Sequence, residues 1–204
     1  MLTFNEDLHA YYWDGKEVPG TTRILGDYLQ VTIGGFRWHI NRHTGQAIPS
    51  EVMEEAAAKG HDIHLACQFI NQGGLDWDAL DPLYQKPAKE YERWLSLYNP
   101  KIIGCEVMVY SVRYGFAGTI DIVCIINGVL WIIDIKTGAS CSVGPQTAAY
   151  LQAYCEQEKY HGLTARGVLW LPKDGGKHKF ERLDKREDWN LFLARLTEHN
   201  YYRR

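Results

Sequence analysis

The sequence of 204 residues has no uninterrupted apolar run of about 18 residues, the length at which a helix can cross a lipid bilayer. Residues 1–7 also have neither the basic start nor the apolar core of a secretory signal peptide. From both absences we expect a cytoplasmic protein that has no membrane partner.

Cysteine pairs at metal-binding spacing are absent too. The five cysteines are scattered and include no Cys-x-x-Cys pair, so we expect neither a zinc ribbon nor an iron–sulfur cluster. Cys67, Cys105 and Cys124 fall in apolar stretches, which predicts small core residues in a reducing compartment.

An excess of positive charge is also missing. The net charge is −3, so the composition gives no overall sign of a nucleic-acid partner. It does not exclude one, because acidic metal ligands offset a local basic groove. Candidate basic spots are Arg113, Arg166, the turn at 173–179 and Arg203-Arg204, although each is more often a solvated charge.

What the sequence does contain is a strong β-hairpin signal. Two β-branched runs, 118–126 and 129–136, flank Asn127-Gly128. Asn-Gly is typical of a two-residue type I′ turn, which fixes the register by pairing the residues on either side of it.

That register predicts two opposed acids. Asp121 would lie directly opposite Asp134, and Lys136 would share their face because side chains alternate along a strand. Like charges so placed are destabilising, and an unpaired carboxylate in an apolar run is costly. A divalent metal ion would justify the arrangement. The alternative is that both aspartates mark strand ends and Lys136 simply neutralises them.

Three further features converge on this hairpin. Glu106, in the preceding strand, would provide a third carboxylate, unless it faces water on an edge strand. His64 lies on the apolar stripe of a predicted helix, where a hydrogen-bonded core histidine is the alternative to a ligand. Gly60, one turn earlier, would let this helix approach the sheet closely. Gln146 and Tyr150 are four residues apart, hence on one face of the helix that follows the hairpin.

Caps and periodicity predict the remaining elements. Ser50 is the expected N-cap of a helix that ends near residue 71, and Pro87 the expected start of a second helix to residue 98. Pro145 would start a third helix, to residue 160, with Gly162 past its end. Strands are expected at 102–110, 167–171 and 178–183, a helix at 187–201, and an N-terminal hairpin at 8–13 and 16–18.

In chain order, these residues resemble the RecB-like branch of the PD-(D/E)XK nuclease superfamily. The matching segments are Gly60-x-x-x-His64, Glu106, Gly118-Thr119-Ile120-Asp121, Asp134-Ile135-Lys136-Thr137-Gly138 and Gln146-x-x-x-Tyr150. The hairpin containing His9-x-Tyr11 and Val18-Pro19 is similar to that of phage-type members. Each motif alone is weakly specific, whereas five in this order are fairly specific.

The resemblance has departures. Ile120 stands where the superfamily name has proline, which is common in this branch. Asp134 replaces the commoner glutamate and keeps the same ligand chemistry on a shorter arm. The cysteine cluster of iron–sulfur members and the helicase segments of larger members are absent, so a stand-alone nuclease is implied.

The resemblance implies a single α/β domain over residues 1–204, in which helices flank a central mixed β-sheet. The catalytic core would occupy 50–204, after an N-terminal β-hairpin and irregular extension at 1–49.

The resemblance also implies a Mg²⁺ or Mn²⁺ site with one or two ions. The implied metal ligands are His64, Glu106, Asp121, Asp134 and the carbonyl of Ile135. The implied catalytic residues are Glu106, Asp121, Asp134, Lys136, Gln146 and Tyr150. Lys136 would orient or help deprotonate the attacking water, and Gln146 and Tyr150 would position that water or the DNA backbone.

We therefore expect a metal-dependent exonuclease that acts at DNA ends in recombination, repair or processing, alongside phage or host recombination proteins. Stand-alone members of this branch often digest single strands, but the ligand set does not encode polarity. The enzymatic alternative is a structure-specific or restriction-type endonuclease. A non-enzymatic alternative is a DNA-binding assembly subunit with a vestigial site. An enzyme acting on a small phosphate ester has little support, because a Gly-rich phosphate loop is lacking.

Overall fold

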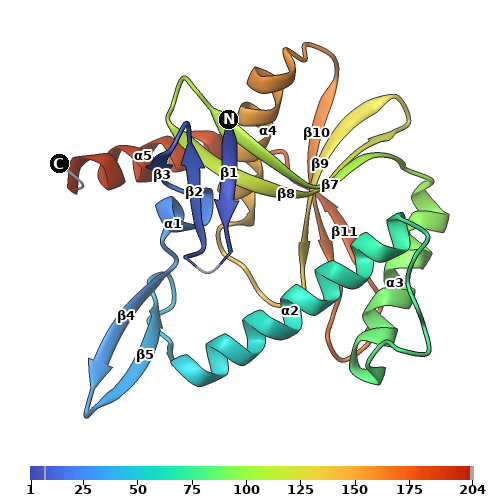
Figure 1. Ribbon diagram of the computed structural model, residues 1–204, viewed down its shortest axis with the longest axis horizontal. Coiled ribbons are helices and arrows are strands. Elements are labelled where there is room, and N and C mark those ends of the chain that lie inside the picture. The colour runs from blue at the N-terminus through green and yellow to red at the C-terminus, as the bar shows by residue number, and fades with distance from the viewer. Residues whose placement is uncertain (7, 203–204) are drawn as a thin grey trace.

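The computed structural model describes residues 1–6 and 8–202 and centres on a five-stranded sheet (Figure 1). Its strands are β7 (Lys101–Ser111), β8 (Phe116–Ile126), β9 (Val129–Lys136), β10 (Thr164–Trp170) and β11 (Lys179–Arg182), in the order β11-β10-β9-β8-β7. Only β9 and β10 pair in parallel; the other neighbours are antiparallel. The predicted mixed sheet is thus confirmed.

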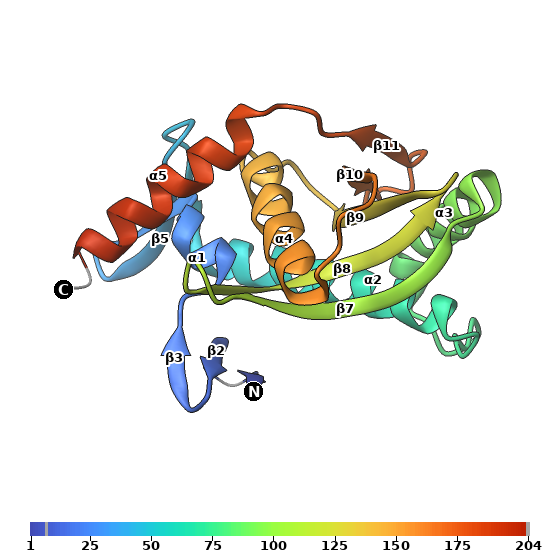
Figure 2. The ribbon, with the colours of Figure 1, turned by 90° about the horizontal axis from the view of Figure 1, so that it is seen from above.

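Helices cover both faces of this sheet. On one face lie α2 (Ser50–Asn71) and α3 (Pro82–Tyr98), and on the other α4 (Val143–Glu158) and α5 (Glu187–Tyr202) (Figures 1 and 2). The expected α/β domain with helices flanking a central sheet is therefore confirmed.

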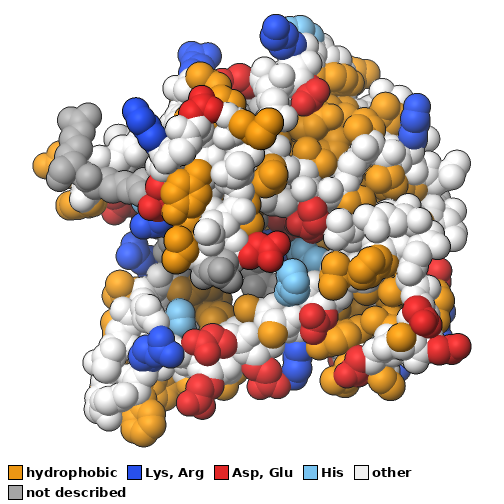
Figure 3. All heavy atoms as spheres, viewed as in Figure 1, with side chains coloured by type: hydrophobic (Ala, Val, Ile, Leu, Met, Phe, Trp, Pro, Cys, Tyr) orange, Lys and Arg blue, Asp and Glu red, His pale blue; other side chains and the backbone are white. Residues whose placement is uncertain are grey.

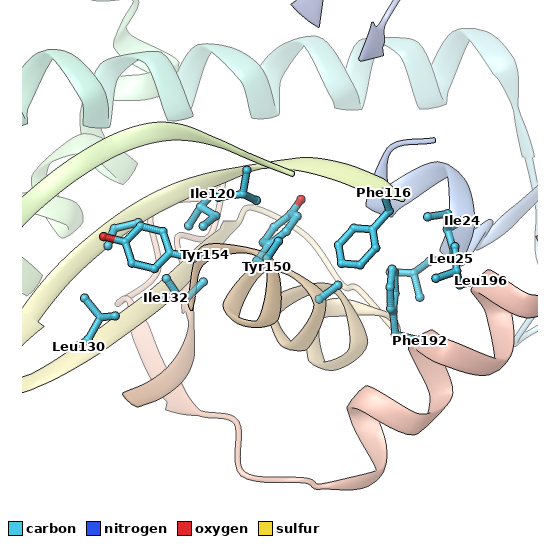
Figure 4. Close-up of a cluster of buried hydrophobic side chains, with 14 residues drawn as sticks. Ile24, Leu25, Phe116, Ile120, Leu130, Ile132, Tyr150, Tyr154, Phe192 and Leu196 are labelled. Atoms are coloured by element: carbon cyan, nitrogen blue, oxygen red, sulfur yellow. The ribbon is translucent and has the colours of Figure 1, made fainter. Parts of the chain in front are cut away.

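Each face has its own hydrophobic core because apolar side chains alternate between the two sides of the central strands. On the α4 side, Ile132 of β9, Tyr150 of α4 and Phe192 of α5 belong to one cluster of buried side chains (Figure 4). On the α2 and α3 side, Ile133 of β9 packs with Ile63 and Trp94. The central strands are thus buried on both faces.

The N-terminal region is more regular than expected. It contains one small sheet of β1 (Leu2–Asn5), β2 (Ala10–Trp13) and β3 (Lys16–Val18), then α1 (Thr21–Leu25), then a second sheet of β4 (Tyr28–Ile33), β5 (Phe36–Asn41) and β6 (Ala47–Pro49). The β2–β3 hairpin was predicted. The prediction of an irregular extension was wrong. Gly34 and Gly35, with φ of +61° and +83°, make a tight turn that allows β4 and β5 to pair as a hairpin.

Three predicted helix boundaries need correction. Ser50 is the first residue of α2 rather than its cap, a position that Pro49 occupies. The second helix starts at Pro82, because the Asp81 side chain accepts a hydrogen bond from the Leu83 amide at 2.8 Å; Pro87 lies inside that helix. The third helix starts two residues before Pro145 and ends before Lys159, whose left-handed φ of +50° caps it ahead of Gly162.

Cys67 and Cys124 are buried in the core on the α2 side, as predicted, while Cys105 is half-buried and accepts a hydrogen bond from Asn71. Among the described residues, no helix is both long and apolar enough to span a membrane.

Candidate active site

The β8–β9 hairpin positions the site. Asn127 and Gly128 both have positive φ, 50° and 79°, as the predicted type I′ turn requires. The register is also the predicted one, from Ile126 opposite Val129 to Ile122 opposite Ile133.

The regular ladder ends one pair before the two aspartates. Asp121 and Asp134 are therefore not a directly opposed ladder pair, and the prediction was wrong at this last step. Instead, Asp121 Oδ2 accepts a hydrogen bond of 2.6 Å from the backbone N–H of Ile135. The carboxylate thus fills the place where a backbone partner would lie, while its charge still acts on Asp134.

The β7–β8 pair is irregular at the same point. Ile120 and Ile122 are two apart on β8, yet Ile120 packs in the core beside α4 and Ile122 in the core beside α2. Residues two apart on a regular strand share a face, so β8 changes its facing at Asp121. Across from it, Glu106 has a left-handed φ of +50°, which is costly for a residue with a side chain. This irregularity lets Asp121 approach both α2 and the end of β9.

Three predicted ligands come together here. The side-chain ligand atoms of His64, Glu106 and Asp121 all lie within 4.8 Å of one another, and His64 Nδ1 is 3.6 Å from Asp121 Oδ2. In Figure 3, acidic and histidine side chains lie side by side in the middle of this face, above α2. A Cβ added to Gly60 would be 3.4 Å from Thr137 Oγ1, so α2 closely approaches the loop after β9.

Asp134 and Lys136 form an ion pair beside this group. Asp134 is 1% exposed, and its Oδ2 is 2.7 Å from Lys136 Nζ. Burial, and then the charge of Asp121, raise the pKa of Asp134 to about 6 despite the opposing effect of Lys136. Burial lowers the pKa of Lys136, but Asp134 and Asp121 outweigh it and raise that pKa, so Lys136 is a cation at neutral pH.

The described residues fit a hard divalent cation. Burial and the charge of Asp121 raise the pKa of Glu106 to about 7, so Glu106 and Asp134 both hold a proton more tightly than a free carboxyl group does. Asp134 Oδ2, although paired with Lys136, accepts no well-directed hydrogen bond from any described residue. Oxygen ligands with one imidazole suit Mg²⁺ or Mn²⁺, and such an ion would relieve the repulsion between the carboxylates.

Gln146 and Tyr150 lie on one face of α4, as predicted, but both are buried. Gln146 Nε2 donates to Tyr150 Oη at 2.9 Å. Burial, and then the charge of Asp134, raise the pKa of Tyr150 well above its usual value, so the phenol is neutral. A Cβ at Gly118 would lie only 2.4 Å from the Tyr150 ring. Glycine there explains how close the helix lies to β8.

Sequence reasoning gave no role to Tyr11 or Asp27. Tyr11 Oη lies 2.8 Å from Thr119 Oγ1, so the first small sheet reaches the site beside Asp121. Asp27 accepts a hydrogen bond from the hydroxyl of Ser142 in the loop after β9, and its charge acts on Lys136. The His9-x-Tyr11 motif was the only signal for either residue.

Arg166, a candidate basic spot, is structural instead. It is 9% exposed and donates hydrogen bonds to Asp188 Oδ2, at 3.1 and 3.0 Å, and to the Gly144 carbonyl. It therefore ties β10 to α4 and α5 and offers no charge to a ligand. Arg203 and Arg204 lie outside the described residues.

Comparison with known families agrees with this geometry. The family model of the PD-(D/E)XK nuclease superfamily matches residues 39–202, which span the central sheet and all four long helices. The chain belongs to this superfamily. It is accordingly a nuclease of the kind that usually uses divalent metals, with a nucleic-acid substrate. Comparison with curated proteins found no match.

The left-handed backbone at Glu106 gives a first prediction. In a regular strand, glycine is less stable than alanine by about 0.5–1 kcal/mol, but a left-handed residue with a Cβ costs about 1–2 kcal/mol. Glu106→Gly should therefore be more stable than Glu106→Ala to urea in EDTA. At Met108, a regular position on the same strand, alanine should be the more stable. If the alanine variant is the more stable one at position 106 as well as at position 108, then the backbone at Glu106 is not strained.

Proposed function

We propose that the protein is a Mg²⁺- or Mn²⁺-dependent DNA exonuclease of the RecB-like branch. It would act at DNA ends during recombination, repair or processing in a bacterial or phage-infected cell, alongside recombination proteins. The supporting observation is the group of His64, Glu106 and Asp121 within 4.8 Å, beside the Asp134–Lys136 pair, in a chain of this superfamily.

The proposed metal ligands are His64, Glu106, Asp121, Asp134 and the carbonyl of Ile135. When bound, the metal would neutralise charge on the non-bridging oxygens of the scissile phosphate. Asp121 is held by the Ile135 amide, so metal binding would cost little further side-chain entropy at this ligand.

The remaining residues serve the attacking water. Lys136 is cationic, so in the metal-free state it cannot take a proton from the attacking water. We therefore assign it to orienting that water and to stabilising negative charge on the phosphate. Glu106 would hold a metal-bound water. Gln146 and Tyr150 are buried, so they would act indirectly, by fixing the position of α4 beside Asp134.

The test is digestion of single- and double-stranded DNA labelled at the 5′ or 3′ end, with Mn²⁺ and with a covalently closed circular control. Release of mononucleotides or short fragments from linear ends, with the circle intact, is expected. Nicking of the circle would instead identify an endonuclease. DNA binding without Mn²⁺ binding or cleavage would favour an assembly subunit.

Substitution of His64 tests whether this histidine is a metal ligand or a core residue. We expect His64→Ala to lose activity and to bind Mn²⁺ at least about tenfold more weakly, because an imidazole ligand is removed. His61→Ala, an exposed histidine on the same helix, is the matched control and should behave as wild type. Lower thermal stability with normal specific activity in His64→Ala would identify a core histidine instead.

A further inference from the structure

A cavity of about 380 Å³ lies between α1, the end of β5 and α5. Figure 1 shows α1 between α5 and the projecting β4–β5 hairpin. The polar side chains that line the cavity are Arg23, Arg42, Arg195, Glu198, His199 and Tyr202. Segments that lie far apart in the sequence therefore combine to form it.

The cavity is locally basic in a chain whose net charge is −3. Three guanidinium groups line it, and Glu198 is the one acidic residue among the lining residues. Arg23 pairs with Glu17 at 2.7 Å and Arg195 with Glu198 at 3.0 Å; the Arg23 side chain is 58% exposed and that of Arg195 29%. Exposed ion pairs are weak, so an incoming anion can compete with Glu17 for Arg23 and with the exposed Glu198 for Arg195. Arg42 is exposed as well.

The cavity adjoins the candidate active site through one segment. Gly26 lines the cavity, and the carbonyl of the next residue, Asp27, accepts a hydrogen bond of 2.9 Å from the Arg42 amide. The Asp27 carboxylate accepts a hydrogen bond from Ser142, in the loop that follows Lys136. The turn at Gly26-Asp27 thus has the arginines on one side and the catalytic loop on the other.

We propose that this cavity binds a phosphate group of the nucleic-acid strand that the active site cleaves. One guanidinium group can donate hydrogen bonds to two phosphate oxygens at once, and arginines from three segments of the chain can surround one phosphate group. The inference rests on the proposed nuclease function and adds a substrate-binding site to it. The phosphate is either the terminal phosphate of a strand or an internal phosphodiester, since both present the same anionic oxygens.

The test uses a fluorescent single-stranded oligonucleotide in Ca²⁺, a cation that often occupies such sites without supporting cleavage, with binding followed by anisotropy over a salt series. Arg42→Gln should bind several-fold more weakly, and Arg23→Gln/Arg42→Gln more weakly still. The slope of log affinity against log salt should fall by about 0.7 for each phosphate that the variant no longer neutralises. Arg182→Gln is the matched control, because Arg182 is exposed, ion-paired to Asp184 and located on β11.

Oligonucleotides with and without 5′ or 3′ phosphates separate the two sources. If the terminal phosphate is bound, it should strengthen wild-type binding, and the Arg42→Gln variant should lose that gain. If an internal phosphate is bound, the Arg42→Gln variant should bind every oligonucleotide more weakly by the same factor, whichever end group it has. Replacing one internal phosphate by a neutral methylphosphonate should then weaken the binding of wild type by a similar factor.

Two outcomes overturn the inference. Folded arginine variants that bind with unchanged affinity and salt slope, while wild type binds and cleaves DNA, would remove the phosphate site and leave the proposed function standing. Wild type that neither binds nor cleaves DNA would remove both.

Discussion

Replacing Lys136 by alanine should reduce metal-dependent DNA cleavage by about 10²- to 10³-fold, the typical cost of removing one group that stabilises transition-state charge. Lys136 is the cation closest to the buried carboxylate of Asp134, at 2.7 Å, and its raised pKa keeps it protonated at neutral pH. The variant should largely retain Mn²⁺ binding, because an ammonium group is not a metal ligand. Asp121→Asn, in contrast, should lose both cleavage and Mn²⁺ affinity.

Single-turnover cleavage at saturating Mn²⁺, together with calorimetric Mn²⁺ titration, measures the two effects separately. Lys101→Ala is the matched control, since Lys101 is an exposed lysine at the far end of β7. Circular dichroism should show that each variant is folded. Near-normal turnover of Lys136→Ala under these conditions would contradict its catalytic role.

The hairpin was predictable because its signals are local. Asn127-Gly128 specifies the turn, and the turn fixes the register as far as Ile122 and Ile133. The helix at 50–71 was predictable for a similar reason, since its periodicity is long and Gly73-Gly74 follows it.

The geometry of the acids was less predictable, because it depends on where that regularity ends. Nothing in a strand-like run such as 101–111 indicates that Glu106 takes a left-handed backbone or that β8 changes its facing at Asp121. The approach of Tyr11 and Asp27 could not be read from the residues either. These interactions join segments about a hundred residues apart, and short-range patterns do not record such packing.

The same limit explains Arg166 and the arginine-lined cavity. In the sequence, Arg166 and Arg42 are both isolated basic residues near strands. The fold buries Arg166 against Asp188, while it leaves Arg42 exposed near Arg23 and Arg195. Tertiary packing alone decides which arginine holds the fold together and which remains available to a ligand.

Replacing Asp134 by asparagine should leave the metal-free protein at least as stable as wild type near neutral pH. The folded-state pKa of about 6 lies above the ordinary 3.8, so the native protein binds the Asp134 proton more tightly than the unfolded chain does. The stabilisation from that proton is full below pH 4 and is lost as the pH rises through 6. One pKa unit corresponds to about 1.4 kcal/mol, so the loss is on the order of 3 kcal/mol. The asparagine side chain carries no charge, so the variant should escape this loss, while the charge of Asp121 still acts on Lys136.

Mn²⁺ should stabilise wild type far more than the variant. At about 100 times its dissociation constant, the ion contributes roughly 2.7 kcal/mol, which raises the Tm of wild type by about 5–10 °C. Asp134→Asn lacks one charged ligand and should gain much less. Asp188→Asn is the matched control: this buried aspartate pairs with Arg166, so its loss should destabilise the fold with EDTA and with Mn²⁺ alike.

Thermal melts of wild type and both variants at pH 4 and pH 7.5, each with EDTA, and at pH 7.5 with Mn²⁺, decide the matter. With EDTA, Asp134→Asn should gain on wild type between pH 4 and pH 7.5, because only wild type acquires a buried charge. If Asp134→Asn instead behaves like Asp188→Asn, and wild type does not respond to Mn²⁺, then Asp134 is a structural partner of Lys136. The proposal of a metal site at these carboxylates would then be wrong.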